Sequence, residues 1–96
     1  MKRIKHTLIC NHLRKYRKAR GLSQRDAARI LGYVNSSRLS RWEHGTCLPK
    51  PVNMFKMAAL YRTLVDALYI DMLRSIREEV QKREQQVLTD RKTSKP

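Results

Sequence analysis

Acidic residues are scarce in this sequence of 96 residues, where 8 aspartates and glutamates stand against 22 lysines and arginines. The few acids are scattered, so no pair of catalytic carboxylates is evident. Nor is there a glycine-rich phosphate loop, or a nucleophile with a nearby base, which makes an enzyme the least favoured class. The length suits one small domain with a modest helical core.

Long apolar runs are absent as well: none approaches the ~20 residues of a membrane-spanning helix, and no signal peptide is visible. We therefore expect a cytosolic protein with no membrane partner. Cysteine is limited to Cys10 and Cys47, without CxxC spacing, and a reducing cytosol predicts two free thiols. The alternative is a metal site built from these cysteines with His6 and His44, but nothing in the sequence brings the pairs together. We expect no metal and no cofactor.

The positive charge is concentrated in the first half of the chain. Residues 1–50 contain 13 basic and 2 acidic side chains, whereas residues 51–96 contain 9 and 6. Such a local excess of positive charge favours a polyanionic partner, and binding that neutralises phosphates weakens as salt is added.

Residues 22–45 carry the strongest pattern, two short helices joined by a tight turn. Ser23 and Asp26 have the spacing of a capping box at a helix start. Apolar residues then recur at helical spacing on one face: Ala27, Ala28, Ile30 and Leu31. Gly32 can adopt the left-handed conformation that ends a helix.

A second helix is predicted at about residues 36–44, after a turn limited to residues 32–34. Asn35 is the expected N-cap and Gly45 the expected stop. Leu39 and Trp42 lie three apart and should point into the core. Trp42 is accordingly interpreted as a structural residue.

The opposite face of this second helix has a different chemistry. Ser37, Ser40, Arg41 and His44 lie on it, with Ser36 and Arg38 on its flanks. None of these side chains is acidic, and the nearby Glu43 turns inward. Arginine can form two parallel hydrogen bonds to guanine, and serine is small enough to let a helix enter the major groove. This face therefore indicates an element that reads DNA.

These residues together resemble the Cro/repressor-type helix-turn-helix transcriptional regulators, the XRE family. The resemblance covers about residues 13–61 and includes the following residues: Leu22-Ser23-Gln24, Ala28, Leu31-Gly32, Leu39-Ser40-Arg41-Trp42-Glu43, Gly45 and Pro49. It implies an all-α fold, a compact five-helix bundle of the phage-repressor DNA-binding type whose third helix is the recognition helix. This chain is one residue longer than the commonest pattern between Gly32 and Glu43, and Ala27 and Ile30 also depart from it.

The resemblance implies a role for individual residues. Base contacts are expected from the second helix of the motif: Ser36, Ser37, Ser40, Arg41 and the flanking Arg38. Phosphate contacts are expected around it: Ser23, Gln24, His44, Arg14, Lys18 and Lys50. Arg17 and Glu43 match the family's structural ion pair between the first and third helices. Among these, Arg41 is the residue most expected to discriminate bases.

The remaining N-terminal residues divide into an arm and a helix. Residues 1–6 form a basic arm whose Lys2, Arg3 and Lys5 could lie along phosphates or in a minor groove; a frayed terminus is the alternative. The helix-turn-helix domain is expected to span residues 7–62. Its first helix is predicted to be capped by Thr7, to point Ile9, Leu13 and Tyr16 inward and to end at Gly21. His12 is interpreted as a surface residue.

After the motif, two prolines predict a loop at residues 46–51 and a helix at residues 52–61. Five residues give that helix a broad core face: Met54, Phe55, Met57, Ala58 and Leu60. Thr63 and Asp66 could form another capping box, so the next helix either starts after a kink or continues the previous one.

A long amphipathic helix is predicted at residues 63–88, followed by a disordered tail at residues 89–96. Its apolar seam has heptad-like spacing, interrupted by Arg83: Tyr69, Leu73, Ile76, Val80 and Val87. We expect homodimerisation through this seam. The alternative is a lone helix held by local ion pairs. Glu79 and Glu84 would oppose each other in a parallel pair, which weakly favours an antiparallel or crossed arrangement.

The sequence thus predicts a bacterial or phage regulator, repressor or activator, that binds double-stranded DNA as a homodimer. Two alternatives remain open. The chain could be the antitoxin of a toxin–antitoxin pair, with its last helix binding a second small protein. It could instead be a helix-mediated interaction adaptor with non-specific nucleic-acid binding.

Overall fold

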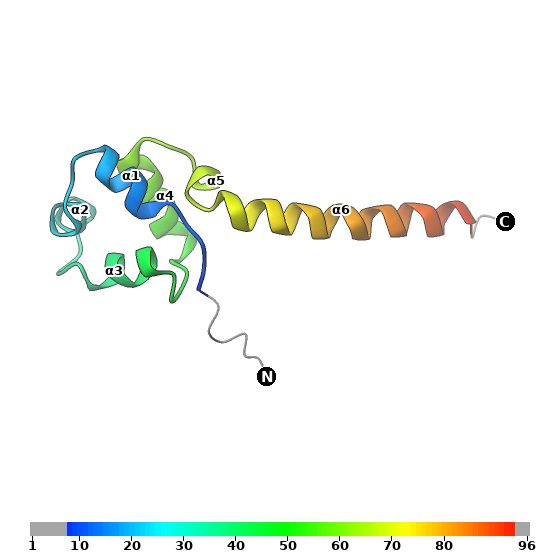
Figure 1. Ribbon diagram of the computed structural model, residues 1–96, viewed down its shortest axis with the longest axis horizontal. Helices are drawn as coiled ribbons and strands as arrows, with labels where there is room; N and C mark the ends of the chain where they lie inside the picture. Colours follow the sequence, from blue (N-terminus) through cyan, green and yellow to red (C-terminus); the bar gives the residue numbers. More distant parts are fainter. Residues whose placement is uncertain (1–7, 94–96) are drawn as a thin grey trace.

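The computed structural model describes residues 8–93, which form six α-helices and no strand. These are α1 (Leu13–Ala19), α2 (Gln24–Leu31), α3 (Ser37–His44), α4 (Pro51–Tyr61), α5 (Val65–Leu68) and α6 (Ile70–Thr93). Helices α1 to α5 pack into one body, and α6 projects from it as a single long rod (Figure 1). The expected all-α class and extended C-terminal helix are confirmed. The described part has one helix more than the five expected, because the segment after α4 is divided.

Helix α1 begins at Leu13, so the prediction of a helix from Thr7 is wrong for residues 8–12, and Thr7 itself lies outside the described residues. The reason is a long-range backbone hydrogen bond. The N–H of Ile9 donates to the carbonyl of Gly45 at 2.8 Å. Pairing with this distant acceptor satisfies the Ile9 amide without a helix.

Asn11 organises the same segment from its side chain. Its Oδ1 accepts from the N–H of Leu13 at 3.1 Å, which satisfies a free donor in the first turn of α1. Its Nδ2 donates to the carbonyls of Ile9, at 3.1 Å, and of Trp42, at 3.0 Å, near the end of α3. The entry to α1 is therefore attached to the end of α3.

Helix α2 begins as predicted, with a capping box. Ser23 Oγ accepts from the N–H of Asp26 at 3.0 Å, and the Asp26 carboxylate accepts from the N–H of Ser23. Gly32 ends the helix with a φ of 87°, in the left-handed region that favours glycine. One detail of the predicted inward face is wrong, since Ile30 is 60% exposed. At 100° per residue, it lies about 100° from the centre of the face formed by residues 27, 28 and 31.

Helix α3 starts at Ser37, one residue later than predicted. Ser36 is the N-cap, without a side-chain cap bond, and Asn35 Oδ1 still accepts from the N–H of Ser37 at 3.0 Å. The connection from α2 is therefore longer than the predicted residues 32–34. Leu39 and Trp42 point inward as expected, with 0% and 6% exposed.

Helix α4 begins at Pro51, in the first helical position that suits proline. Its buried side is formed by Met57, Ala58 and Tyr61. The prediction that Phe55 belongs to the core is wrong, because that ring is 66% exposed. Residues 54, 57, 58 and 61 form the inward stripe at helical spacing, and Phe55 falls on the other side of it.

The segment after α4 is broken twice. Arg62 adopts a positive φ of 57° after α4, and Leu64 is the N-cap of α5 without a side-chain bond, so the predicted Thr63–Asp66 capping box is not formed. The second break is at Tyr69, whose φ and ψ are −128° and 40°. Leu68 and Tyr69 are both buried. Neighbouring residues of a continuous helix point about 100° apart, and the break lets both face the core.

Two predictions for the C-terminal segment are corrected by these observations. Tyr69 cannot belong to an exposed seam, because it is part of the core. The tail predicted to be disordered from residue 89 is helical as far as Thr93, beyond which the chain lies outside the described residues. Arg91 and Lys92 in the last turn favour this longer helix, since positive charges stabilise a helix C-terminus.

A buried ion pair connects α1, α2 and α3. Arg17 Nε donates to Glu43 Oε2 at 2.6 Å, and both side chains are less than a tenth exposed. Arg17 also donates to the carbonyl of Leu22 at 2.8 Å, and Gln24 Nε2 donates to Glu43 Oε1 at 3.0 Å. The hydrogen bond that Arg17 donates to Glu43 raises the pKa of Arg17, although burial partly opposes this shift. Arg17 therefore stays charged, and its bonds to Glu43 hold α3 in one rotation about its axis.

Two tyrosines are buried in the core. Tyr61 and Tyr69 are 3% and 5% exposed, and burial raises the pKa of each phenol to about 12. Both phenols therefore stay protonated in the folded protein at pH values where an exposed tyrosine ionises.

Removing one partner of the buried ion pair should be costly. Replacing Arg17 with Met leaves the Glu43 carboxylate buried without its cation, and we expect a loss of about 3 kcal/mol in the free energy of unfolding, measured by urea denaturation. The double replacement of Arg17 by Met and Glu43 by Leu should recover much of this loss. Glu79→Gln, which breaks the exposed pair between Glu79 and Arg83, is the matched control and should change stability by less than about 0.5 kcal/mol. Equal effects of the Arg17 and Glu79 replacements would contradict the structural role of the pair.

The buried tyrosines predict a loss of stability at high pH. Their folded pKa of about 12 lies above the unfolded value of about 10. Their contribution is fully present below pH ~10 and is lost as pH rises through ~12, by of order 2 kcal/mol per tyrosine. A variant carrying Tyr61→Phe and Tyr69→Phe should therefore lose less free energy of unfolding between pH 10 and 12 than the unmodified chain. Parallel pH profiles for the two proteins would argue against this assignment.

Candidate nucleic-acid interface

The outward face of α3 contains three residues predicted from the sequence to contact bases, together with His44, which is predicted to contact phosphate. With Leu39 and Trp42 buried, the helical spacing directs four exposed side chains away from the core: Ser37, Ser40, Arg41 and His44. None of the four is acidic. Glu43, the one acid of α3, is held inside by Arg17. A surface of hydroxyls and long cationic donors on an exposed helix can hydrogen-bond to base edges and phosphates.

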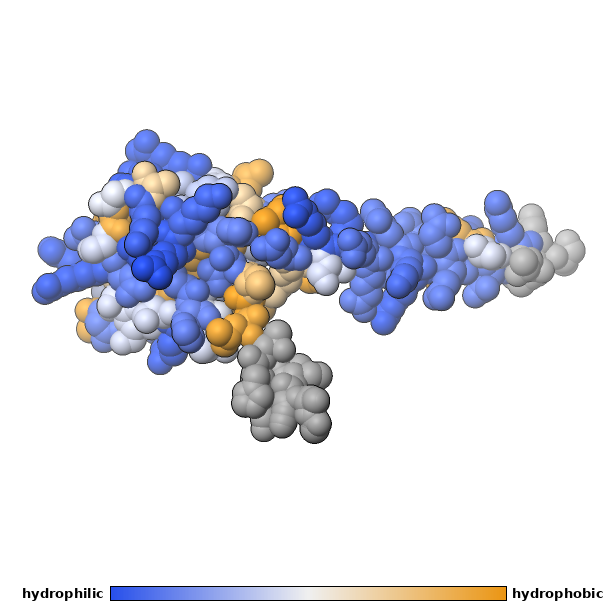
Figure 2. Space-filling view, viewed as in Figure 1, coloured by the Kyte–Doolittle hydropathy of each residue, from blue (hydrophilic) through white to orange (hydrophobic). Residues whose placement is uncertain are grey.

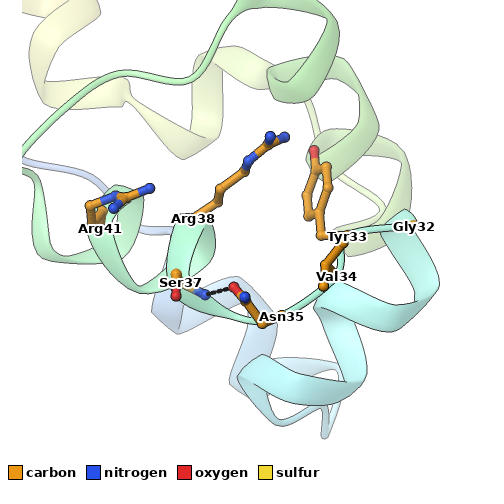
Figure 3. Close-up of a pocket in the computed structure, with 7 residues that line it drawn as sticks. All are labelled: Gly32, Tyr33, Val34, Asn35, Ser37, Arg38 and Arg41. Carbon is orange, nitrogen blue, oxygen red and sulfur yellow. Dashed lines mark hydrogen bonds between the residues drawn. The ribbon is translucent and has the colours of Figure 1, made fainter.

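The two flanking residues are placed differently. Ser36 is half-buried as the N-cap of α3. The guanidinium carbon of Arg38 lies 5.3 Å from the centre of the Tyr33 ring, a cation–π contact, and Figure 3 shows the two side chains next to each other, with Arg41 apart from them. Lys56 Nζ lies 5.6 Å from the same ring. Arg38 is therefore drawn to the α4 side of α3.

A depression between α1, α2 and α3 brings several of the predicted contacts together. Its lining consists of Arg14, Arg17, Gln24, Ser40, Glu43 and His44. Because Glu43 is paired with Arg17, the exposed rim keeps a positive character from Arg14. The Gln24 amide donates one hydrogen bond to Glu43, which orients it next to Ser40 in this depression. Three predicted phosphate contacts and one predicted base contact thus share one site.

Two further depressions meet at the connection between α2 and α3. One is lined by Gly32, Tyr33, Val34, Asn35, Ser37, Arg38 and Arg41 (Figure 3). The other is lined by Arg25, Ala28, Arg29, Tyr33, Val34, Asn35 and Ser36. Four of these lining residues are not among the contacts predicted from the sequence: Arg25, Arg29, Tyr33 and Val34. The four-residue spacing of Arg25 and Arg29, which places both on one face of α2, was the available signal for the first two.

The other predicted phosphate contacts are distributed around α3. Ser23 is exposed, and because its oxygen accepts the cap bond its hydroxyl hydrogen remains available to a phosphate. Lys18 and Lys50 are exposed on α1 and at the N-cap of α4. The arm residues Lys2, Arg3 and Lys5 lie outside the described residues. The described chain begins beside Gly45, where Ile9 pairs with it, at the C-terminal end of α3.

Cys10, Cys47 and His12 have no predicted contact with DNA. Cys10 and Cys47 are exposed free thiols, and no group of three or more potential metal-ligating side chains occurs within residues 8–93. His12, predicted as a surface residue, is partly covered. Its Nε2 lies 3.1 Å from Oδ2 of Asp71 in α6. Its backbone N–H donates to the carbonyl of Leu68 at 2.8 Å. His12 thus links the entry of α1 to the base of α6.

Figure 2 shows hydrophilic side chains over most of the visible face of the helical body and of α6, with apolar side chains gathered where the two meet. The positive charge of residues 1–50 belongs to the part of the chain that carries α1, α2 and α3. None of the described helices combines the length and the apolar character that crossing a membrane requires.

Comparison with known proteins agrees with this geometry. The helix-turn-helix family model HTH_3 matches residues 13–68, which is more than half of the chain and runs from the start of α1 to the end of α5. No curated protein and no solved structure gives a significant match. The matched region contains the α2–α3 motif, the buried ion pair and the outward face of α3. The chain therefore belongs to the helix-turn-helix family of DNA-binding regulators of the Cro/repressor, or XRE, type.

Proposed function

We propose that the protein is a sequence-specific transcriptional regulator that binds double-stranded DNA as a homodimer, with α3 in the major groove. The observation that carries the proposal is the outward face of α3. It is exposed, free of acids, and lies opposite the buried Leu39 and Trp42. In this proposal Ser37, Ser40 and Arg41 contact base edges, while Ser36 and Arg38 act from the flanks.

Phosphate contacts complete the proposed interface. Arg14, Gln24 and His44 line one depression beside α3, so a single strand of the DNA backbone could contact all three. Ser23, Lys18 and Lys50 are exposed around them. Such contacts position the protein on DNA without reading its sequence, and they make affinity fall with salt.

The homodimer is proposed to form through α6. Leu73 is half-buried at its base, whereas Ile76, Val80 and Val87 are 49%, 56% and 55% exposed along it. Their spacing is that of a coiled-coil seam that is broken at Arg83. A guanidinium nitrogen of Arg83 lies 3.2 Å from Oε2 of Glu79. A helix of 24 residues that projects from a small body leaves this seam uncovered in one chain. A second copy would cover it and present two α3 helices to two half-sites.

The exposed helix α6 also suits a second candidate function. The same seam could bind a different small protein, as an antitoxin binds its toxin, while the helix-turn-helix domain binds DNA. An adaptor with only non-specific nucleic-acid binding would use α6 in the same way. These alternatives differ from the homodimer in what α6 binds, and from each other in whether a DNA motif is recognised.

Replacing Arg41 with Ala should weaken binding to the selected DNA site by ~1–3 kcal/mol and relax preference at one base pair. Replacing Lys50 with Ala should weaken binding to all DNA sequences by the same factor and reduce the salt dependence of binding. The measurement is fluorescence anisotropy on a site selected from random duplexes and on single-base variants, at several salt concentrations. Uniform losses from both replacements would contradict the separate roles of the two residues. Failure to enrich any motif would contradict sequence-specific regulation and favour an adaptor.

Charge introduced into the seam of α6 should separate the dimer. Val80→Asp should weaken self-association at least about tenfold, because two carboxylates would face a desolvated apolar seam. The neighbouring exposed residue provides the control, since Gln81→Asp places the same charge off the seam. Sedimentation of the three proteins at micromolar concentration measures the effect. A monomeric unmodified chain, with or without DNA, would contradict the homodimer, and copurification of a second small protein through α6 would favour the antitoxin alternative.

A further inference from the structure

Val34 is the most exposed of the large apolar residues noted at the surface of the described chain. Its exposed fraction is 99%, and the next highest value is 72%, at Leu64. Single apolar residues at a surface need no special explanation. An almost fully exposed valine is different when its neighbours are anchored and its surroundings are cationic, as they are here.

The residues on both sides of Val34 are held in place. The N–H of Tyr33 donates to the carbonyl of Ala28 at 2.8 Å, and its phenol donates to Asn53 at 2.6 Å. The Tyr33 ring also meets Trp42 edge-on, with 5.8 Å between ring centres. On the other side, Asn35 accepts from the N–H of Ser37. Val34 is thus presented by a fixed backbone, so a partner that covers it would order little additional chain.

Cationic side chains surround this valine on two sides. It borders the depression that contains Arg38 and Arg41, and also the depression that contains Arg25 and Arg29. No acidic residue lines either depression. Four arginines with an apolar group between them suit a partner that carries both negative charge and an apolar group. In the major groove of DNA, the phosphates supply the charge and the thymine C5-methyl supplies the apolar group.

The position of Val34 along the chain agrees with such a contact. It lies three residues before the start of α3, and the N-terminal part of a recognition helix is the part that contacts base edges. The longer connection between α2 and α3 leaves Val34 outside the core, while Tyr33 occupies the inward position next to Trp42. Among the residues that line these two depressions, Val34 supplies a branched apolar side chain at the surface.

We propose that Val34 is a specificity-determining residue that packs against the C5-methyl group of a thymine in the major groove. This inference rests on the proposed function, because it requires α3 to enter the groove. It assigns the exposed valine a role that the hydroxyl and guanidinium groups of α3 cannot fill, since a methyl group offers no hydrogen-bonding partner.

The test combines a change in the protein with removal of the methyl group from the DNA. A bound site is first selected from random duplexes by the full chain. Each thymine is then replaced by deoxyuridine, which lacks only the C5-methyl, symmetrically in the two half-sites. Dissociation constants are measured for the unmodified chain and for Val34→Ala. We expect one thymine at which replacement by deoxyuridine raises the dissociation constant of the unmodified chain about threefold to fivefold, as burial of a methyl group predicts.

The same deoxyuridine should leave the dissociation constant of Val34→Ala unchanged, because this variant has already lost the apolar contact. Val52→Ala is the matched control: Val52 is also an exposed valine, at 65%, but it lies on α4 and should retain the full effect of deoxyuridine. Equal sensitivity of the unmodified chain and Val34→Ala at every thymine, or no sensitivity in either, would overturn the assignment while leaving sequence-specific binding intact. If no motif is enriched in the selection, the proposed function and this inference both fail.

Discussion

The interaction between Arg17 and Glu43 controls how α3, the second helix of the helix-turn-helix motif, is presented. A carboxylate and a guanidinium that are both almost fully removed from water are tolerated only when they are paired and hydrogen-bonded, and here Gln24 and the Leu22 carbonyl complete the set. Because Glu43 belongs to α3, this pair fixes the rotation of α3 about its own axis. Because Leu39 and Trp42 are also buried, helical spacing makes Ser37, Ser40 and Arg41 point outward.

The end of α3 is fixed by backbone contacts rather than by charge. Gly45 has a φ of 88°, and a Cβ there would lie 2.5 Å from the carbonyl oxygen of Ile9, so no larger residue fits where the Ile9 N–H donates to the Gly45 carbonyl. Asn11 and His12 extend this attachment, the first to the carbonyls of α3 and the second to Leu68 and Asp71. The short segment before α1 therefore connects the end of α3 to the base of the projecting helix α6. In a dimer formed through α6, such an attachment would help set the separation of the two α3 helices.

The surface around α3 divides into parts with different chemistry. The depression shared with α1 and α2 combines Arg14, Gln24 and His44, which suits a phosphate. The connection before α3 combines arginines with Val34, which suits a base edge that carries a methyl group. Arg38 contacts Tyr33 and thus belongs to the border with α4 rather than to the centre of the face. This division follows from the rotation of α3 and from the extra residue in the preceding connection.

The sequence by itself determined the features that depend on neighbours within about four residues. The capping box of Ser23 and Asp26, the glycine stops, the start of α4 within one residue of its predicted position and the inward pair Leu39 and Trp42 are all of this kind, and together they were enough to indicate the helix-turn-helix family. Only the tertiary structure decided where α1 begins, why the chain breaks at Tyr69, and that Ile30 and Phe55 lie outside the core. The reason is physical: local hydrogen bonds and helical spacing are encoded in adjacent residues. Whether Ile9 donates to Gly45, or Tyr69 leaves the helix to enter the core, depends instead on distant groups that meet only after the chain has folded.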